Sequence, residues 1–235
     1  MSRIDALIAE LCPDGVEHRG LGEVGQFVRG NGLQKSDLTD AGVGAIHYGQ
    51  VHTIYGTWAD ATRSFVSEKT ARKLRKARSG DLVIATTSED DAAVAKAVAW
   101  VGPDEIAVSG DAYIYRHSLQ PKYVAYFFQT EDFQAQKTRH ITGTKVRRIS
   151  GDSLAKIKIP VPPLEIQQEI VVILDKFTKL EAELEARRRQ YRHYRDELLT
   201  FAAAGSGQRA AGSGQRAAGS GQRAAGSRSK VGDLG

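Results

Sequence analysis

The most extended hydrophobic pattern in the chain runs from Leu164 to about Phe201. Apolar side chains recur there at alternating steps of four and three residues, and only Arg187 interrupts the series. Because these steps average three and a half residues, they are typical of a coiled-coil seam, and we predict one long helix that pairs through it. The seam positions are Ile166, Ile170, Ile173, Phe177, Leu180, Leu184, Tyr191, Tyr194, Leu198 and Phe201.

Such a helix would extend over roughly 55 Å, which is more than a small domain can cover. Charged residues, among them Glu165, Glu181 and Glu185, flank the seam, so only a narrow stripe favours burial. We therefore expect a partner helix, either in a second molecule or in another part of a longer protein. The alternative is an ordinary amphipathic core helix, although such helices average about a dozen residues.

A second helical pattern stands at the start of the chain. Ile4, Leu7, Ile8 and Leu11 have the spacing of one helix face, which predicts a short amphipathic helix. The helix is expected to end at the turn sequence that begins with Pro13.

Between Val24 and about Ile159 the pattern changes to short apolar runs separated by turn residues. These runs are rich in β-branched and aromatic side chains, which indicates strands. The candidate strands are Ala45–Tyr48, Asp81–Ala85, Val94–Val101 and Ala112–Tyr115. A further helix is predicted over Lys122–Gln136; its core-facing side chains are Tyr123, Tyr126, Phe127 and Phe133. The mixture predicts one α/β domain with many loops.

The composition changes on either side of the long helix. Three prolines at 160, 162 and 163 interrupt the chain before it, and Pro163 suits a first helical turn. Beyond it, Gly-Ser-Gly-Gln-Arg-Ala-Ala occurs three times from Gly205 to Ala225, a composition that predicts a flexible linker. We therefore expect a domain over residues 1–159, a long spacer helix over 160–203, and a linker and tail over 204–235.

Overall composition narrows the class of protein. The 235 residues carry a formal net charge of +5 and give a pI near 9.3, a mild basic excess. The single cysteine, Cys12, excludes an internal disulfide, and no Cys/His set has zinc-ligand spacing. Neither a secretory signal nor an apolar stretch of membrane-spanning length is evident, so we expect a cytoplasmic protein.

The sequence gives little support for a catalytic function. No P-loop, nucleophile elbow, dinucleotide fingerprint or methyltransferase-type glycine loop is present. The run Glu89-Asp90-Asp91 follows a predicted strand and could hold a divalent metal in a nuclease; a solvated loop is the alternative interpretation. His47 and His52 have no common metal-ligand spacing and are better interpreted as surface contacts.

Positive charge is clustered in two segments of the predicted domain. Such clusters neutralise phosphates and favour nucleic-acid binding, although a solvated helix face is the alternative for either cluster alone. The first cluster comprises Lys69, Arg72, Lys73, Arg75, Lys76 and Arg78; the second comprises Lys137, Arg139, His140, Lys145, Arg147 and Arg148. Neighbouring residues that could contact DNA, several of them at base edges, are Gln50, His52, Thr86, Thr87, Ser88, Thr142, Gly143 and Thr144. A third group, Arg187–Arg189 with Arg192 and Arg195, is explained equally well by acids of a partner helix.

Several segments together resemble the specificity (S) subunits of type I restriction–modification enzymes, most closely the type IC branch. The proline-rich start of the long helix and its end near Gln190–Leu199 are the most specific match, and Leu180–Ala186 is similar to a Thr-Ala-Glu-Leu spacer repeat. The resembling segments are Leu7–Glu17, Leu21–Val24, Ile46–Thr53, Gly80–Ala85, Thr142–Ile149 and Ile157–Phe201. They cover nearly everything from residue 1 to residue 201.

The resemblance implies a mixed α/β target recognition domain, followed by a coiled-coil-forming helix, that reads DNA without catalysing a reaction. Full-length S subunits carry two such domains, and two antiparallel helices set their separation. Modification (M) subunits contribute the methyltransferase and S-adenosylmethionine, and restriction (R) subunits use ATP and Mg²⁺. The chain itself is expected to bind no cofactor.

This chain has one domain and one helix, so we interpret it as a half-length S subunit that dimerises through the helix and reads a bipartite site. The alternative is a truncated fragment of a two-domain S subunit. Two other classes stay open: a metal-dependent DNA enzyme that uses Glu89, Asp90 and Asp91, and a coiled-coil adaptor that does not bind DNA.

Overall fold

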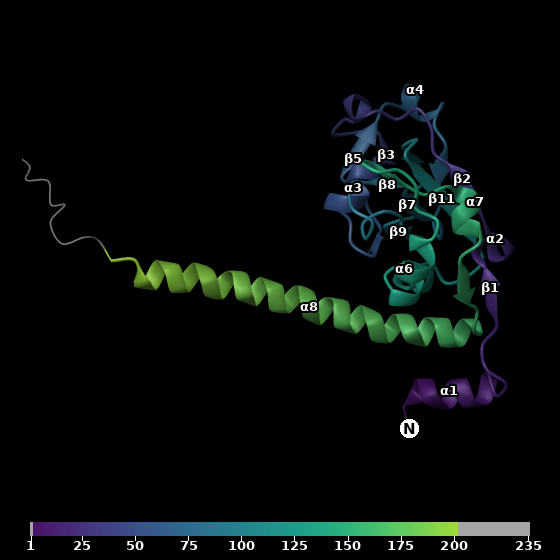
Figure 1. Ribbon diagram of the computed structural model, residues 1–235. Helices are drawn as coiled ribbons and strands as arrows, with labels where there is room; N and C mark the ends of the chain where they lie inside the picture. The colour runs from purple at the N-terminus through teal and green to yellow at the C-terminus, as the bar shows by residue number, and fades with distance from the viewer. Residues whose placement is uncertain (1, 202–235) are drawn as a thin grey trace, which may run out of the picture. The chain divides into compact units, whose positions relative to one another are not determined.

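The computed structural model describes residues 2–201 (Figure 1). The predicted linker and tail over 204–235 lie outside the described residues. The chain divides into two units, Met1–Glu183 and Leu184–Gly235. Within the described part, no helix is long and apolar enough to cross a membrane.

A five-stranded sheet forms the centre of the α/β domain, in the order β2 (Gly25–Arg29), β11 (Ala112–His117), β7 (Leu82–Ala85), β9 (Ala97–Trp100) and β4 (Trp58–Ala59). Neighbouring strands are antiparallel except β4 and β9, which are parallel. All four residues of β7 are buried, because both faces of the sheet are covered. This explains its uninterrupted apolar sequence.

A second, four-stranded sheet has the order β5 (Ser64–Val66), β3 (Val43–Ile46), β10 (Ile106–Val108) and β6 (Lys76–Ala77). Strands β3 and β10 are parallel, and the outer pairs are antiparallel. Two short ladders complete the strand pairing. Strand β1 (His18–Gly20) pairs with β13 (Lys158–Pro160), and β8 (Thr87–Ser88) pairs with β12 (Arg147–Arg148).

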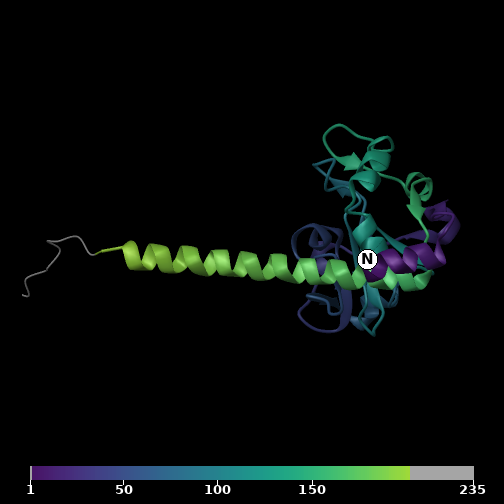
Figure 2. The same ribbon diagram turned by 90° about the horizontal axis from the view of Figure 1, so that it is seen from below.

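Short helices cover the sheets and connect the strands. They are α2 (Leu21–Val24), the 3-10 helix Lys35–Asp37, α3 (Tyr48–Thr53), α4 (Glu68–Ala71), α5 (Pro121–Phe127), α6 (Glu131–Thr138) and α7 (Gly151–Ala155). Helix α1 (Arg3–Leu11) runs along the first turns of α8, where Arg3 Nε lies 3.4 Å from Glu169 Oε2 (Figure 2).

Helix α8 covers Leu164–Leu199, which confirms the long helix expected from the seam. Its first seam position, Ile166, is 1% exposed and belongs to the buried part of the domain, and Ile170 packs against the domain core. From Phe177 onward the seam is exposed: Phe177, Leu180, Leu184, Tyr191, Tyr194, Leu198 and Phe201. The seam therefore serves the chain's own core only at its beginning.

The N-terminal helix and all four candidate strands are present, with bounds that differ by a few residues. The single helix predicted over Lys122–Gln136 is wrong, because the structure has two helices there, α5 and α6. The break falls at Thr130, whose extended backbone (φ −72°, ψ 152°) and side-chain acceptance from Phe133 N make it the N-cap of α6. The four aromatic side chains of the predicted helix nevertheless face the core, three of them buried and Tyr126 in part.

Candidate nucleic-acid interface

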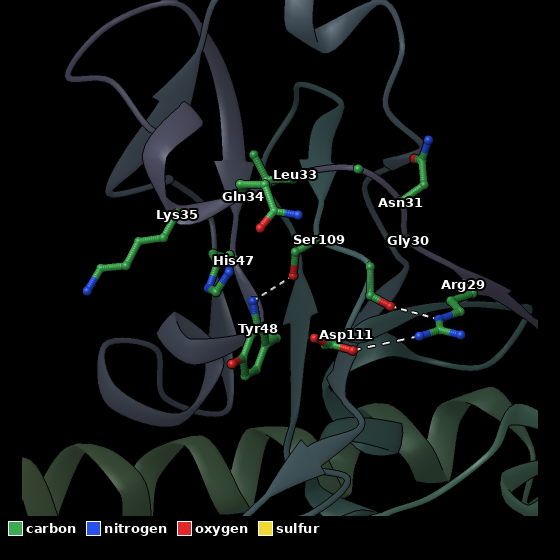
Figure 3. A pocket seen from close by; sticks show the side chains of 12 residues that line it. Arg29, Gly30, Asn31, Leu33, Gln34, Lys35, His47, Tyr48, Ser109 and Asp111 are labelled. Atoms are coloured by element: carbon green, nitrogen blue, oxygen red, sulfur yellow. Dashed lines mark hydrogen bonds and ion pairs between the residues drawn. The ribbon is translucent and has the colours of Figure 1, made fainter.

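A polar cavity of about 580 Å³ lies where three loops of the α/β domain meet (Figure 3). One wall is the loop that follows β2, the second is the start of α3, and the third is the loop between β10 and β11. The lining residues are Arg29, Gly30, Asn31, Gly32, Leu33, Gln34, Lys35, His47, Tyr48, Ser109, Gly110 and Asp111.

Close packing and hydrogen bonds fix the positions of these walls. Tyr48 N donates to Ser109 Oγ at 2.8 Å, which joins the start of α3 to the third wall. A Cβ at Gly30 would collide with the Ser109 carbonyl, so this close approach requires glycine. Burial lowers the pKa of His47, which favours the neutral imidazole in this wall.

Arg29 and Asp111 stand together at the edge of the cavity. Arg29 Nε donates to Gly110 O at 2.8 Å, and Arg29 Nη2 lies 3.7 Å from Asp111 Oδ1 (Figure 3). Both side chains remain about half exposed, so each keeps polar atoms accessible to a ligand. A guanidinium suits guanine or phosphate, and a carboxylate can accept from the amino group of cytosine.

A second cavity, of about 190 Å³, shares Arg29 and Asp111 with the first. Its other lining residues are Thr86, Thr87, Tyr113, Thr142, Arg148, Ile149 and Ser150. Because the cavities share two lining residues, they lie next to each other, and we call the two together the concave surface. Four residues predicted from the sequence thus lie near one another: Thr86, Thr87, Thr142 and Arg148.

Asn31 attaches the first basic cluster to the concave surface. Its Nδ2 donates to Lys73 O at 2.9 Å, and its Oδ1 accepts from Arg75 N at 2.7 Å. Arg75 Nη1 also donates to Arg29 O at 2.6 Å. The exposed side chains of Lys69, Arg72, Lys73 and Arg75 therefore lie on a segment that is tied to one wall of the cavity.

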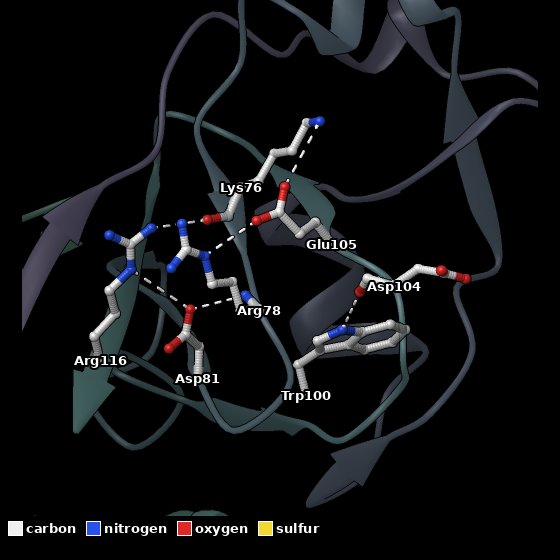
Figure 4. A network of polar contacts seen from close by, with 7 residues as sticks. All are labelled: Lys76, Arg78, Asp81, Trp100, Asp104, Glu105 and Arg116. Carbon is white, nitrogen blue, oxygen red and sulfur yellow. Dashed lines mark hydrogen bonds and ion pairs between the residues drawn. The ribbon is translucent and has the colours of Figure 1, made fainter. Parts of the chain in front are cut away.

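Arg72 Nη2 lies 3.7 Å from Glu68 Oε2, and the other two cations of this cluster, Lys76 and Arg78, also have an acidic partner. Glu105 lies 3.9 Å from Lys76 Nζ and 3.1 Å from Arg78 Nε (Figure 4). Arg78 N donates to Oδ2 of Asp81, a carboxyl whose pKa is raised by burial. Since surface ion pairs of this kind contribute little to stability, exchange of Glu105 for a phosphate would cost little free energy.

The second basic cluster is centred on a tight hairpin beside the second cavity. Thr142 and Arg148 exchange two backbone hydrogen bonds, of 2.9 and 2.8 Å. Gly143 has φ +91°, a left-handed conformation in which a Cβ would collide with Val146 O. The residues around this turn are exposed, Thr144 and Lys145 among them.

Two arginines of this cluster differ in their surroundings. Arg147 Nε lies 2.9 Å from Asp91 Oδ1, and its Nη1 donates to Gly143 O at 2.7 Å, so it helps to hold the hairpin. Arg148 lines the second cavity, and Arg139 is exposed at the C-cap of α6.

The assignment of Lys137 to the DNA-binding set is not supported by its position. The residue is 1% exposed, and Nζ donates to Ala92 O at 3.1 Å and to Val94 O at 2.9 Å. Burial lowers the pKa of the ammonium group to about 8. Lys137 therefore fastens the 92–94 segment to α6 and presents no charge to a phosphate.

Three other predicted base-reading residues already have intramolecular partners. Gln50 Oε1 accepts from His47 N, its Nε2 donates to Ser64 Oγ, and Thr86 Oγ1 donates to Asp111 O. His52 Nε2 lies 3.0 Å from the carbonyl oxygen of Thr87, and burial lowers the pKa of the ring. Base contacts by Gln50 or Thr86 would have to displace these bonds.

The sequence patterns did not single out most residues of the larger cavity. Those missed are Arg29, Asn31, Gln34, Lys35, Tyr48, Ser109 and Asp111. The sequence did hold a signal: Asn31 lies between two glycines, and Ser109 and Asp111 flank Gly110 directly after the apolar run Ile106–Val108.

The acidic run predicted as an alternative metal site does not form a metal-ligand cluster. Within residues 2–201, no group of three or more His, Cys, Asp or Glu side chains could hold a metal ion. Asp91 is paired with Arg147, and Asp90 Oδ1 accepts from Ala92 N at 3.0 Å.

Comparison with known proteins shows the family. Residues 13–191 match the family described as type I restriction modification DNA specificity domain. The chain belongs to this family. The resemblance that the sequence suggested is thereby confirmed.

Curated relatives agree with this membership. The specificity subunit of the type I restriction enzyme EcoR124I/EcoR124II from Escherichia coli is 29% identical over 201 residues, which are 79% of this chain and 48% of the relative. A putative type I specificity subunit of Mycoplasma pneumoniae, S.MpnORF615P, is 56% identical over 46 residues, 20% of this chain and 18% of the relative. The chain spans about half the length of the first of these relatives.

Two solved structures share the fold. A chain from a structure of the type I R-M system, described in terms of complex assembly and conformational transition, has a TM-score of 0.58 at 20% identity, and the match covers 83% of this chain and 48% of that one. The HsdS subunit from Thermoanaerobacter tengcongensis has a TM-score of 0.53 at 21% identity, with 78% and 44% covered. These likenesses confirm a mixed α/β domain followed by a long helix.

Proposed function

We propose that this chain is a non-catalytic DNA-recognition subunit of a type I restriction–modification system. The observation that carries the proposal is the concave surface, which has an exposed basic segment attached to each of its two cavities. Family membership supplies the reaction context: methyltransferase subunits with S-adenosylmethionine, and restriction subunits that use ATP and Mg²⁺, would be directed to duplex DNA by this chain.

The exposed cations are suited to hold the phosphate backbone while the cavities meet the base edges. Phosphate contacts set position and contribute no sequence information directly, whereas side chains of the concave surface can discriminate bases. Arg29, Gln34 and Asp111 are among the lining residues whose side chains have donor or acceptor groups for that role. Each phosphate contact should contribute about 0.9 to the salt dependence of the logarithm of the binding constant.

The proposal includes self-association. Residues 2–201 form a domain and a helix with an exposed seam that a second copy would cover, and two copies related by a two-fold axis would read an interrupted palindrome. The alternative is a fragment of a two-domain S subunit, whose helix would find its mate elsewhere in the longer chain.

Light scattering combined with selection from a randomised duplex library tests both parts. The purified chain, alone and with a matched M subunit, is expected to be dimeric and to select two inverted half-sites at a fixed spacing. A monomer that selects one half-site would identify a fragment. A dimer without salt-dependent DNA affinity would refute DNA recognition and favour a coiled-coil adaptor.

Catalysis by the isolated chain is a separate outcome. Incubation with duplex DNA and Mg²⁺ or S-adenosylmethionine, without M or R subunits, is expected to leave the DNA intact and unmethylated. Nicking that is abolished by Asp90→Asn would instead support the metal-dependent alternative.

A further inference from the structure

An apolar groove of about 330 Å³ lies between α5 and the first turns of α8. Its lining residues are Tyr123, Tyr126, Phe127, Gln129, Thr130, Pro160, Ile170 and Leu174. The two tyrosine hydroxyls are engaged at its rim: Tyr123 donates to Pro160 O at 2.9 Å, and Tyr126 donates to Asp175 Oδ1 at 2.7 Å. The groove therefore presents ring faces and aliphatic side chains, with few polar atoms.

The opposite end of the seam carries large apolar side chains that are suited to such a groove. Phe201 is 82% exposed and Leu198 is 72% exposed. Both continue the seam that contains Ile170, so the groove and the exposed end belong to one hydrophobic series.

Antiparallel pairing of two α8 helices sets seam positions opposite one another in several registers, which differ from one another by whole heptads. In each of these registers, steps of four face steps of four and steps of three face steps of three, and one of the registers is centred between Glu185 and Ala186. The resulting layers are Ile170 with Phe201, Ile173 with Leu198, Phe177 with Tyr194, Leu180 with Tyr191 and Leu184 with Arg187. A parallel pair would instead place two Arg187 side chains in one layer, where like charges repel.

Charges beside the seam favour the same register. It sets Glu181 near Arg188 of a second copy and Lys176 near Glu197 of a second copy, and two-fold symmetry repeats each pair. A shift of one heptad in one direction brings Glu181 against its own equivalent. A shift in the other direction does the same with Arg188.

We propose that the groove between α5 and α8 is the docking site for the C-terminal end of α8 of a second copy, with Phe201 seated beside Ile170. The proposal rests on the self-association within the proposed function and adds its register and its end point. In this arrangement each domain holds the helix end of the other copy, so the groove determines the separation of the two DNA-reading surfaces.

Exposed positions allow a test that leaves the fold intact. Phe201→Asp removes the side chain assigned to the groove, and Leu199→Asp is a matched control, because Leu199 is 68% exposed and lies off the seam. The dissociation constant of the dimer is measured by sedimentation on the full chain. Phe201→Asp should raise it on the order of 100-fold or more, since two symmetric contacts are lost, whereas Leu199→Asp should change it by less than about threefold.

Disulfide cross-linking tests the register directly. In a Cys12→Ser background, Ile170→Cys combined with Phe201→Cys should give an oxidised covalent dimer, because a disulfide needs Cα atoms within about 7 Å. Val172→Cys combined with Phe201→Cys is the control, since Val172 is exposed on another face of α8.

The outcomes separate this proposal from the function on which it rests. A dimer that is unaffected by Phe201→Asp, or one that cross-links equally well in the control pair, overturns the groove and leaves self-association standing. A monomeric wild-type chain overturns both. A dimer that forms the control cross-link but still selects a DNA sequence would support DNA recognition and not the groove.

Discussion

Replacing Asn31 by alanine is expected to lower both the stability of the α/β domain and its affinity for DNA. The side chain makes two hydrogen bonds, to Lys73 O at 2.9 Å and from Arg75 N at 2.7 Å. At about 0.5–1.5 kcal/mol net for each bond, Asn31→Ala should cost about 1–3 kcal/mol. For a domain of this size the melting temperature falls by about 2–4 °C for each kcal/mol.

The functional loss should exceed what destabilisation alone produces. Without Asn31, the main chain that carries Lys73 and Arg75 is no longer fixed to the wall of the cavity, so both cations lose their set positions. If both phosphate contacts are lost, the salt dependence of binding should decrease by about 1.8. DNA affinity measured over a series of salt concentrations, at a temperature where the variant is fully folded, gives this slope.

Gln34→Ala is the matched control for this experiment. Gln34 is exposed and lines the same cavity, so its truncation should change stability by no more than about 0.5 kcal/mol. It should alter sequence preference and leave the salt slope unchanged. If Asn31→Ala keeps the wild-type slope, the attachment of the basic segment to the cavity does not matter for binding, and the reasoning fails.

Three further changes have expected outcomes. Burial lowers the pKa of Lys137 to about 8, so above that pH the unfolded chain binds more protons than the folded one. The free energy of unfolding should therefore rise by at most about 2 kcal/mol between pH 8 and about 9.5. Urea titrations of Lys137→Met should lack this rise. Gly143→Ala forces a left-handed alanine against Val146 O and should cost about 1–3 kcal/mol locally, seen as faster amide exchange in the hairpin; exchange at the wild-type rate would contradict it. The double substitution Leu180→Asp and Leu184→Asp should abolish dimerisation, as measured by light scattering. A dimer that survives would exclude the seam as the interface.

The sequence predicted those elements whose pattern is local. The long helix was predicted from the regular spacing of its apolar residues, and β7 from four consecutive apolar residues, all of which are buried in the structure. Strand β1 was missed because His18–Gly20 is polar and short, and only its pairing with β13 makes it a strand. The break between α5 and α6 was missed because Thr130 interrupts no apolar period while it caps the second helix.

The candidate site was predictable in its charges and not in its walls. Exposed runs such as Lys69–Lys73 are visible in the sequence, but burial of a cation is not, and Lys137 was therefore misassigned. The cavity itself joins residues far apart in the chain: Arg29 meets Asp111 because β2 pairs with β11. No spacing rule along the sequence encodes such a meeting.

The pairing of β1 with β13 has a consequence for the architecture as a whole. The chain enters the α/β domain through His18–Gly20 and leaves it through Lys158–Pro160, and the two segments lie side by side. A domain whose entry and exit are neighbours is joined to the rest of the chain at one place, so its loops can vary while the two strands stay paired. Under the proposed function, the residues that would read DNA lie between these two strands, and helices α1 and α8 lie outside them.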